Sequence, residues 1–210
     1  FVELHLSDVL TFKKSSSFQF TSNSTNIANL KNNTIFQAYT KLQSFCDFNQ
    51  SYKIHLSKKI PIGSGLGGGS SNAATTLKVL NSLWRLKLSN RKLCEIGISI
   101  GSDVPFFITG GNQYVSKAGD LLTPLKTLKL SKYYILLIYP DIHIDTKWAY
   151  GALKKGLEVP KRHNKFLDFN NQVNWKLLKN DFEHVVFSTY PEISEIKKQL
   201  ISRKVLYAGL

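Results

Sequence analysis

The most informative segment of the chain reads Pro61-Ile62-Gly63-Ser64-Gly65-Leu66-Gly67-Gly68-Gly69-Ser70-Ser71-Asn72-Ala73-Ala74. Five of the seven positions 63–69 are glycine, a residue that adopts positive φ and lets a ligand approach the backbone without a Cβ in the way. The alternating residues 52–56 predict a strand before this loop, and Ala73, Leu77, Leu80 and Trp84 have helical spacing after it. The predicted order is therefore strand, glycine loop, helix.

A glycine loop at the start of a helix predicts an anion site. The first amides of a helix have no partner within the helix, and its dipole is positive at that end, so a phosphate chain is the natural occupant. A flexible linker is the alternative interpretation of a Gly/Ser tract. Because this loop is short, contains Leu66 and joins periodic elements at both ends, we favour a phosphate-binding loop.

Several known phosphate loops do not fit. Gly63, Gly65 and Gly68 match the spacing of the dinucleotide fingerprint, but no acidic residue follows about 20 positions later, where Ser89 and Asn90 stand. A Walker A loop needs lysine where Gly69 stands. The protein-kinase HRD and DFG motifs do not occur in the chain.

The rest of the N-terminal half predicts a mixed α/β unit. Residues 6–12 and 17–21 indicate a pair of strands, residues 22–33 a loop, and residues 34–47 a helix. A second helix is predicted over residues 90–100, capped by Ser89 or Asn90 and ended at Gly101. Short strands are expected near residues 114–115 and 121–122.

The C-terminal half predicts a second unit. Residues 126–132 form a basic connector, and the apolar residues 133–139 predict a buried strand. Helices are expected over residues 146–153, 175–188 and 191–203, a final strand over 205–207, and an exposed excursion over 158–174.

Composition excludes several classes of protein. The chain has 210 residues, 42% of them hydrophobic, and no apolar run near the ~18 residues of a membrane span. Cys46, Cys94 and the five histidines show no metal-ligand spacing, and two such cysteines favour a reducing compartment over a disulfide framework. The chain contains no methionine and begins at Phe1, so we expect that residues upstream are missing.

The charge is strongly basic. The 28 Lys and Arg residues against 14 Asp and Glu give a net charge of +14, which raises nucleic-acid binding as a possibility. Only Arg85, Arg91, Arg162 and Arg203 are arginines, and the lysines are scattered. This pattern favours attraction for small anions over a nucleic-acid surface.

Three motifs carry a family resemblance. The loop at residues 61–74 resembles the ATP-binding motif of the GHMP kinases, and its triple glycine followed by Ser-Ser-Asn-Ala-Ala is the form of members that act on 4-diphosphocytidyl-2-C-methylerythritol. Gly101-Ser102-Asp103-Val104-Pro105-Phe106-Phe107 and Asn180-Asp181-Phe182-Glu183 are similar to two further segments of those members. The resemblance implies an α+β fold, with a ribosomal-S5-like ATP-binding domain over residues 1–128 and a ferredoxin-like domain over 129–210, both incomplete. It also implies a bacterial cytoplasm or a plastid-type organelle.

The resemblance further implies ATP- and Mg²⁺-dependent phosphorylation of the C2 hydroxyl of this substrate, without nucleic-acid or membrane partners. Asp103 matches the catalytic aspartate of the family, and its alternative role is that of a helix cap. Asn33 and Lys58 match positions that meet adenosine. The loop residues that the resemblance assigns to ATP are Pro61, Ile62, Gly63, Ser64, Gly65, Leu66, Gly67, Gly68, Gly69, Ser70 and Ser71, of which the two serines are also candidate helix caps.

The chain also departs from the family pattern. The family begins with a Pro-Ala-Lys strand and a Gly-Tyr-His segment that are absent here, and the chain stops at Leu210 where relatives continue into a second Ser/Gly loop. We therefore predict that residues 1–210 alone are inactive. The alternatives are another GHMP kinase, of homoserine or phosphomevalonate type, and a basic RNA-binding module with an S5-like fold.

Overall fold

A computed structural model describes residues 1–24, 27, 32–46, 50–117, 119, 121–125, 130, 133–153 and 173–210. The chain divides into two compact units, Phe1–Lys126 and Thr127–Leu210. Each unit is described by itself.

The sheet of the first unit has three strands, and the strand that precedes the glycine loop is central. Strand β3 (Ser51–Ser57) pairs antiparallel with β1 (Val9–Ser15) on one side and parallel with β2 (Gln19–Ser22) on the other. The prediction that the first two strands pair with each other was wrong. Alternate residues of β3 are buried, whereas the inward residues of β1 and β2 are only half-buried. The strand flanked on both sides is thus the most buried one.

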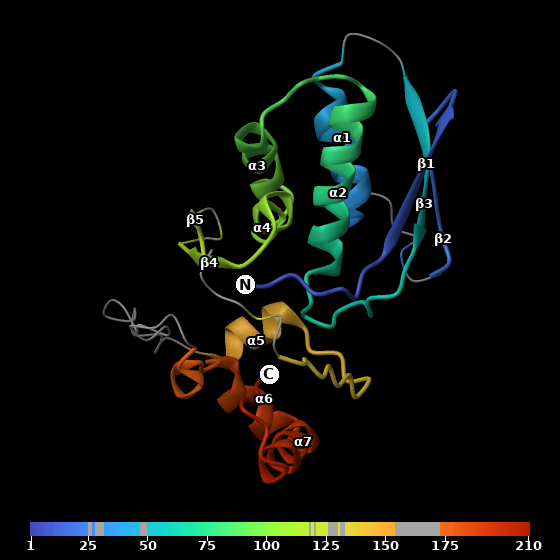
Figure 1. The fold of residues 1–210 in the computed structure, drawn as a ribbon. Coiled ribbons are helices and arrows are strands. Elements are labelled where there is room, and N and C mark those ends of the chain that lie inside the picture. Colours follow the sequence, from blue (N-terminus) through green and yellow to red (C-terminus); the bar gives the residue numbers. More distant parts are fainter. Residues whose placement is uncertain are drawn as a thin grey trace. The chain divides into compact units, whose positions relative to one another are not determined.

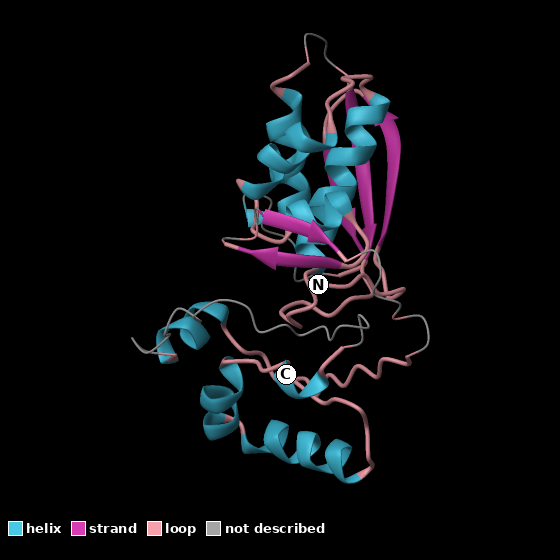
Figure 2. Ribbon diagram, turned by 60° about the vertical axis from the view of Figure 1, so that its left-hand side comes forward, coloured by secondary structure: helices cyan, strands magenta, loops and turns pink. Residues whose placement is uncertain are grey.

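Four helices cover one side of this sheet (Figures 1 and 2): α1 (Thr34–Gln43), α2 (Gly68–Leu83), α3 (Asn90–Ile98) and α4 (Val104–Thr109). The helical spacing predicted for α1 and α2 is confirmed, since their apolar positions are buried in one cluster with the inner face of β3. The side chains of that cluster include Ile35, Ala38, Leu42, Ile54, Leu56, Ala73, Leu77, Leu80 and Trp84. Helix α1 ends at Gln43, four residues before its predicted end.

A second, two-stranded ladder follows α4. Strands β4 (Gln113–Ser116) and β5 (Leu121–Pro124) pair antiparallel, which confirms the two short strands predicted there.

The regular elements that the structure describes in the second unit are helices, separated by irregular segments. It contains α5 (Thr146–Ala152), the 3-10 turn η3 (Trp175–Leu177), α6 (Phe182–Thr189) and α7 (Pro191–Ser202). Glu183 and Lys197 join α6 to α7, with Nζ 2.6 Å from Oε2. The single helix predicted over residues 175–188 is therefore two pieces, and most of the predicted excursion at 158–174 lies outside the described residues.

The buried strand predicted at residues 133–139 was wrong. These residues form no ladder within the described part of the chain, and their side chains are open to solvent, with Tyr134 104% and Leu136 73% exposed. An apolar run becomes a buried strand only where a neighbour supplies backbone partners. The strand predicted at 205–207 is absent from the described residues for the same reason.

Candidate active site

The glycine loop leads into the start of α2 without a side-chain cap. Gly63, Gly65 and Gly67 have φ values of 73°, 72° and 68°, all in the left-handed region. Gly67 is the N-cap of α2, so it offers no side chain to the free amides of the first turn, and that turn contains no acidic residue. The amides and the positive end of the helix dipole are therefore left for a ligand.

Gly67 is also required by space. A Cβ at this position would lie 2.8 Å from Cε2 of Phe107 on α4. The loop therefore passes close to the Phe107 ring, and a side chain at position 67 would force the loop or the ring to shift.

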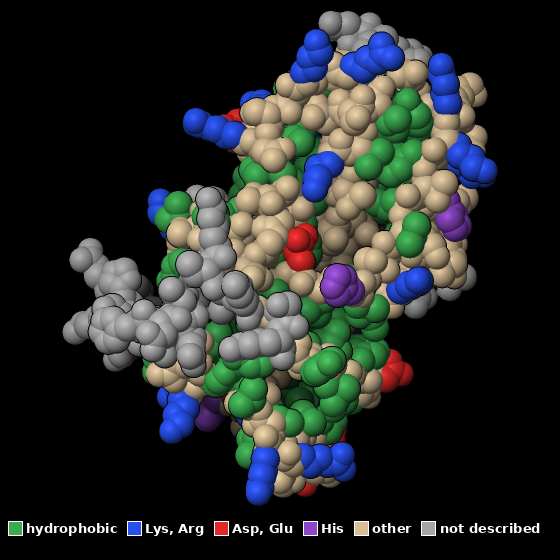
Figure 3. All heavy atoms as spheres, viewed as in Figure 1, with side chains coloured by type: hydrophobic (Ala, Val, Ile, Leu, Met, Phe, Trp, Pro, Cys, Tyr) green, Lys and Arg blue, Asp and Glu red, His purple; other side chains and the backbone are tan. Residues whose placement is uncertain are grey.

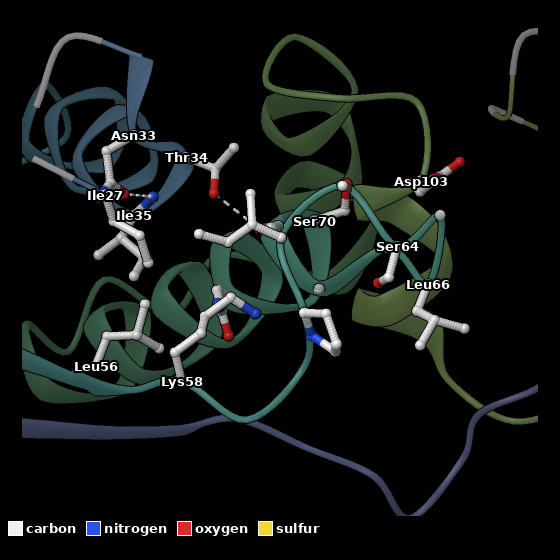
Figure 4. A pocket seen from close by; sticks show the side chains of 18 of the residues that line it. Ile27, Asn33, Thr34, Ile35, Leu56, Lys58, Ser64, Leu66, Ser70 and Asp103 are labelled. Atoms are coloured by element: carbon white, nitrogen blue, oxygen red, sulfur yellow. Dashed lines mark hydrogen bonds between the residues drawn. The ribbon is translucent and has the colours of Figure 1, made fainter. Parts of the chain in front are cut away.

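A pocket of about 520 Å³ opens along the loop (Figure 4). Its lining contains the predicted residues Asn33, Lys58, Pro61, Ile62, Gly63, Ser64, Gly65, Leu66, Gly67, Gly68, Gly69, Ser70 and Asp103. Ser71 does not line it, and its N–H donates to the Gly67 carbonyl at 2.9 Å as part of the helix. The structure thus brings together residues that are up to 70 positions apart in the sequence.

The end of the pocket near α1 combines apolar side chains with the polar residues Asn32, Asn33 and Thr34. Asn33 is only 7% exposed, and its Oδ1 caps α1 by accepting from the Ile35 N–H at 2.8 Å. Its Nδ2 has no hydrogen-bond partner among the described residues. Ile27, Ile35 and Leu56, which the sequence analysis did not assign to the site, supply an apolar wall there.

Asp103 lies at the other end of the loop, directly before α4 (Figure 4). It occupies the N-cap position, but its side chain makes no capping hydrogen bond within the described part of the chain. Within the described part of the chain, its carboxylate accepts one long hydrogen bond, from the Ser102 hydroxyl to Oδ1 at 3.5 Å. The carboxylate is therefore not committed to the helix, contrary to the capping alternative.

The packing of α4 against α3 sets the position of Asp103. A Cβ on Gly97 of α3 would lie 2.7 Å from Cγ1 of Val104, the residue after Asp103. The two helices are therefore in contact through a glycine.

Lys58 lines the pocket but its ammonium group is engaged. Nζ lies 2.7 Å from Oδ2 of Asp8 and also donates to the Ile60 carbonyl. Asp8 has a side chain that is 1% exposed, and sequence reasoning missed it because no local pattern marks it. Thr34, also missed, joins α1 to the loop by donating from Oγ1 to the Gly69 carbonyl at 2.8 Å.

The distribution of charges and of possible metal ligands bears on whether the described part of the chain holds a further site. On the face drawn in Figure 3, Lys and Arg side chains are separated by uncharged surface. Among the described residues, no three His, Cys, Asp or Glu side chains gather as metal ligands, and no described helix has the length and hydrophobicity to cross a bilayer.

Comparisons with known proteins show the family of the chain. Residues 33–111, a stretch that contains the glycine loop and Asp103, match the family described as GHMP kinases N terminal domain. The chain is 40% identical to the 4-diphosphocytidyl-2-C-methyl-D-erythritol kinase of Thermodesulfovibrio yellowstonii, over 95% of this chain and 71% of that protein. It is 33% identical to the protein of the same name from Chlorobium chlorochromatii, over 100% of this chain and 74% of that protein.

The chain therefore belongs to the 4-diphosphocytidyl-2-C-methyl-D-erythritol kinase family. The chain superposes on a crystal structure of a 4-(cytidine 5'-diphospho)-2C-methyl-D-erythritol kinase with a TM-score of 0.72 at 24% identity. The match covers 98% of this chain and 73% of that one. This likeness confirms the predicted GHMP kinase fold.

Proposed function

We propose that this protein transfers the γ-phosphoryl group of ATP to the C2 hydroxyl of 4-diphosphocytidyl-2-C-methyl-D-erythritol. The observation that carries the proposal is the uncapped start of α2 at Gly67, in a pocket that has the uncommitted Asp103 carboxylate at one end. The names of the relatives supply the acceptor.

The two ends of the pocket suit the two ends of ATP. The free amides of the first turn of α2 would donate to phosphate oxygens. The apolar wall of Ile27, Ile35 and Leu56 would receive the adenine ring, and Nδ2 of Asn33 would donate to one of its acceptor nitrogens. All of these residues lie in the first unit, which supports the assignment of ATP binding to residues 1–128.

Asp103 would act as the general base. As the hydroxyl oxygen bonds to the γ-phosphorus, its proton passes to the carboxylate, the bond to the bridging oxygen breaks, and ADP leaves. A group engaged in capping would be a poor acceptor for that proton, so the absence of a capping bond at Asp103 within the described residues supports this role.

The pocket also suits Mg²⁺ bound mainly through the nucleotide. This ion keeps several waters and takes one or two protein oxygens beside substrate phosphates. The Asp103 carboxylate and the Ser70 hydroxyl are oxygen atoms in the lining that could serve as ligands to this ion. When bound, the ion would neutralise charge on the β- and γ-phosphates.

A panel of acceptors tests the proposal on the complete enzyme. We expect ADP formation with 4-diphosphocytidyl-2-C-methyl-D-erythritol, and none with homoserine, with phosphomevalonate, or with methylerythritol lacking the cytidine diphosphate group. Turnover of homoserine or phosphomevalonate in place of the cytidylated acceptor would assign the protein to another GHMP activity. RNA binding that ATP does not compete with would contradict the kinase site.

A further inference from the structure

The most completely satisfied charged group near the loop is Asp8, which lies just before β1. Its side chain is 1% exposed, and four donors reach it. Oδ1 accepts from the N–H of Lys59 at 2.7 Å and of Ile60 at 2.8 Å. Oδ2 accepts from Nζ of Lys58 at 2.7 Å and from Nδ2 of Asn72 at 2.9 Å.

These donors come from both sides of the glycine loop. Lys59 and Ile60 lead from β3 into the loop, whereas Asn72 lies on α2 just beyond its first turn. One carboxylate thus joins the residue before the loop to the helix after it. The loop between them is rich in glycine, so it has little stiffness of its own, and its two ends are fixed by Asp8.

Only a carboxylate satisfies this set of donors. An ionised Asp offers acceptors alone, whereas an amide of the same shape would turn an N–H₂ group toward the Lys58 ammonium or the Asn72 amide. Burial by itself would raise the pKa of Asp8, but the hydrogen bonds from Lys58, Ile60, Lys59 and Asn72 outweigh it and hold the pKa below its ordinary value. Asp8 is therefore charged at neutral pH.

Asp8 also fixes the position of a cation beneath the helix start. A Cβ on Gly68, the first residue of α2, would lie 3.2 Å from Nζ of Lys58. An unpaired ammonium near a helix N-terminus is unfavourable because the dipole is positive there. The Asp8 carboxylate balances this charge and holds the lysine to one place.

We propose that Asp8 is a positioning residue for phosphate binding, which holds the two ends of the glycine loop and Lys58 so that the first amides of α2 face the nucleotide. The inference rests on the proposed function. It assigns Asp8 and its partner Lys58 to the phosphate end of the pocket, beside Gly68, and not to the adenosine end near Asn33, where the family resemblance had placed Lys58.

The test compares ADP with adenosine on the wild-type chain, Asp8→Asn, Asp8→Glu and a control, Glu183→Gln. The control removes the charge from a carboxylate that also pairs with a lysine, at 2.6 Å, but on α6 and α7. ADP affinity is measured by calorimetry, adenosine affinity by ligand-detected NMR, and thermal melts without ligand confirm that each variant is folded.

We expect Asp8→Asn to weaken ADP binding by about tenfold or more and adenosine binding by less than about twofold. Glu183→Gln should leave both affinities unchanged. Asp8→Glu keeps the charge and both oxygens, so its loss of ADP affinity should be smaller than that of Asp8→Asn. If Asp8→Asn does not fold, a loss confined to ADP in Asp8→Glu supports the proposal, and unchanged ADP affinity overturns it.

Equal losses for ADP and adenosine, no loss, or tighter ADP binding in folded Asp8→Asn would each overturn the positioning role. Tighter binding would mean that Asp8 masks Lys58 instead of orienting the loop. Failure of the wild-type chain to bind ADP would overturn the proposed function, and this inference with it.

Discussion

The first N–H groups of α2 and α3 differ in whether a side chain caps them. At α3, Ser89 takes an extended conformation and its Oγ accepts from the Lys92 N–H at 3.2 Å. At α2, Gly67 is left-handed and supplies no cap. A capped start is satisfied by its own chain, whereas an uncapped start beside a pocket leaves its donors to a ligand.

The same division holds for the other helices of the first unit. Among its described residues, α1 is capped by Asn33, and α4 begins at Asp103 without a capping bond. The two uncapped starts, at Gly67 and Asp103, both line the pocket. Asn33 also lines the pocket, but its Oδ1 is used by the cap and only its Nδ2 is open to a ligand. Capping therefore separates helix starts whose amides are satisfied by their own chain from those whose amides are left for a ligand.

The largest effect is expected where the uncapped residue is itself the base. Asp103→Asn should lower kcat of the complete enzyme by about 10²-fold to 10⁴-fold, because the amide cannot take the hydroxyl proton. ADP affinity and the melting temperature should stay close to wild type, since this side chain does not cap α4. Steady-state assays and calorimetry measure the two quantities, and substantial remaining turnover would exclude Asp103 as the base.

Adding one methyl group at the start of α2 should have the next largest effect. Ala at Gly65 or Gly67 costs about 1–2 kcal/mol for the left-handed backbone. At Gly67 the Cβ also meets Phe107 at 2.8 Å, whereas at Gly65 nothing lies within 4 Å. Gly67→Ala should therefore reduce both stability and ADP affinity more than its matched control Gly65→Ala, as shown by thermal melts and calorimetry. The reverse order would contradict the close approach to α4.

Acid should loosen the start of α2 before that of α3. The pKa of Asp8 is lowered below its ordinary value of 3.8 in the folded state. The stability it contributes is therefore complete above that value and is lost as the pH falls from 3.8 through the folded-state pKa. Denaturation across this range should show that the difference in the free energy of unfolding between wild type and Asp8→Asn becomes smaller as the pH falls. Hydrogen exchange should detect the loss of protection first at residues 68–72. A difference that grows in acid would contradict the assignment.

The smallest effect is expected at the capped start. Ser89→Ala should destabilise the protein by about 1 kcal/mol through the loss of the cap. Because this helix start does not line the pocket, ADP affinity should not change. Urea denaturation and calorimetry make the comparison, and a change in ADP affinity would remove the distinction between the two kinds of helix start.

Local patterns predicted what depends on near neighbours in the chain. The helical spacing after Thr34 and after the loop, the alternation before it, and the cap at Ser89 are all confirmed. Each involves residues within a few positions of one another, so the sequence alone carries the signal.

Contacts between distant segments could not be predicted in this way. The pairing of β2 with β3 in place of β1 depends on a partner more than 30 residues away. Asp8 is satisfied by donors 50 to 64 positions further along the chain. The apolar residues 133–139 have the composition of a buried strand, but composition does not supply a partner strand.

The contact between Gly97 and Val104 has a consequence for how variants of this protein should be classified. Position 97 lies outside the pocket lining and bears no functional group, yet a single added methyl group there would push on the residue next to Asp103. A survey of substitutions that inactivate the enzyme should therefore recover position 97 together with position 103. The two classes of variant should differ in ADP affinity and in folding stability, which substitution of Asp103 leaves close to wild type. The position of the reactive carboxylate thus depends partly on the absence of a side chain at position 97 of the neighbouring helix.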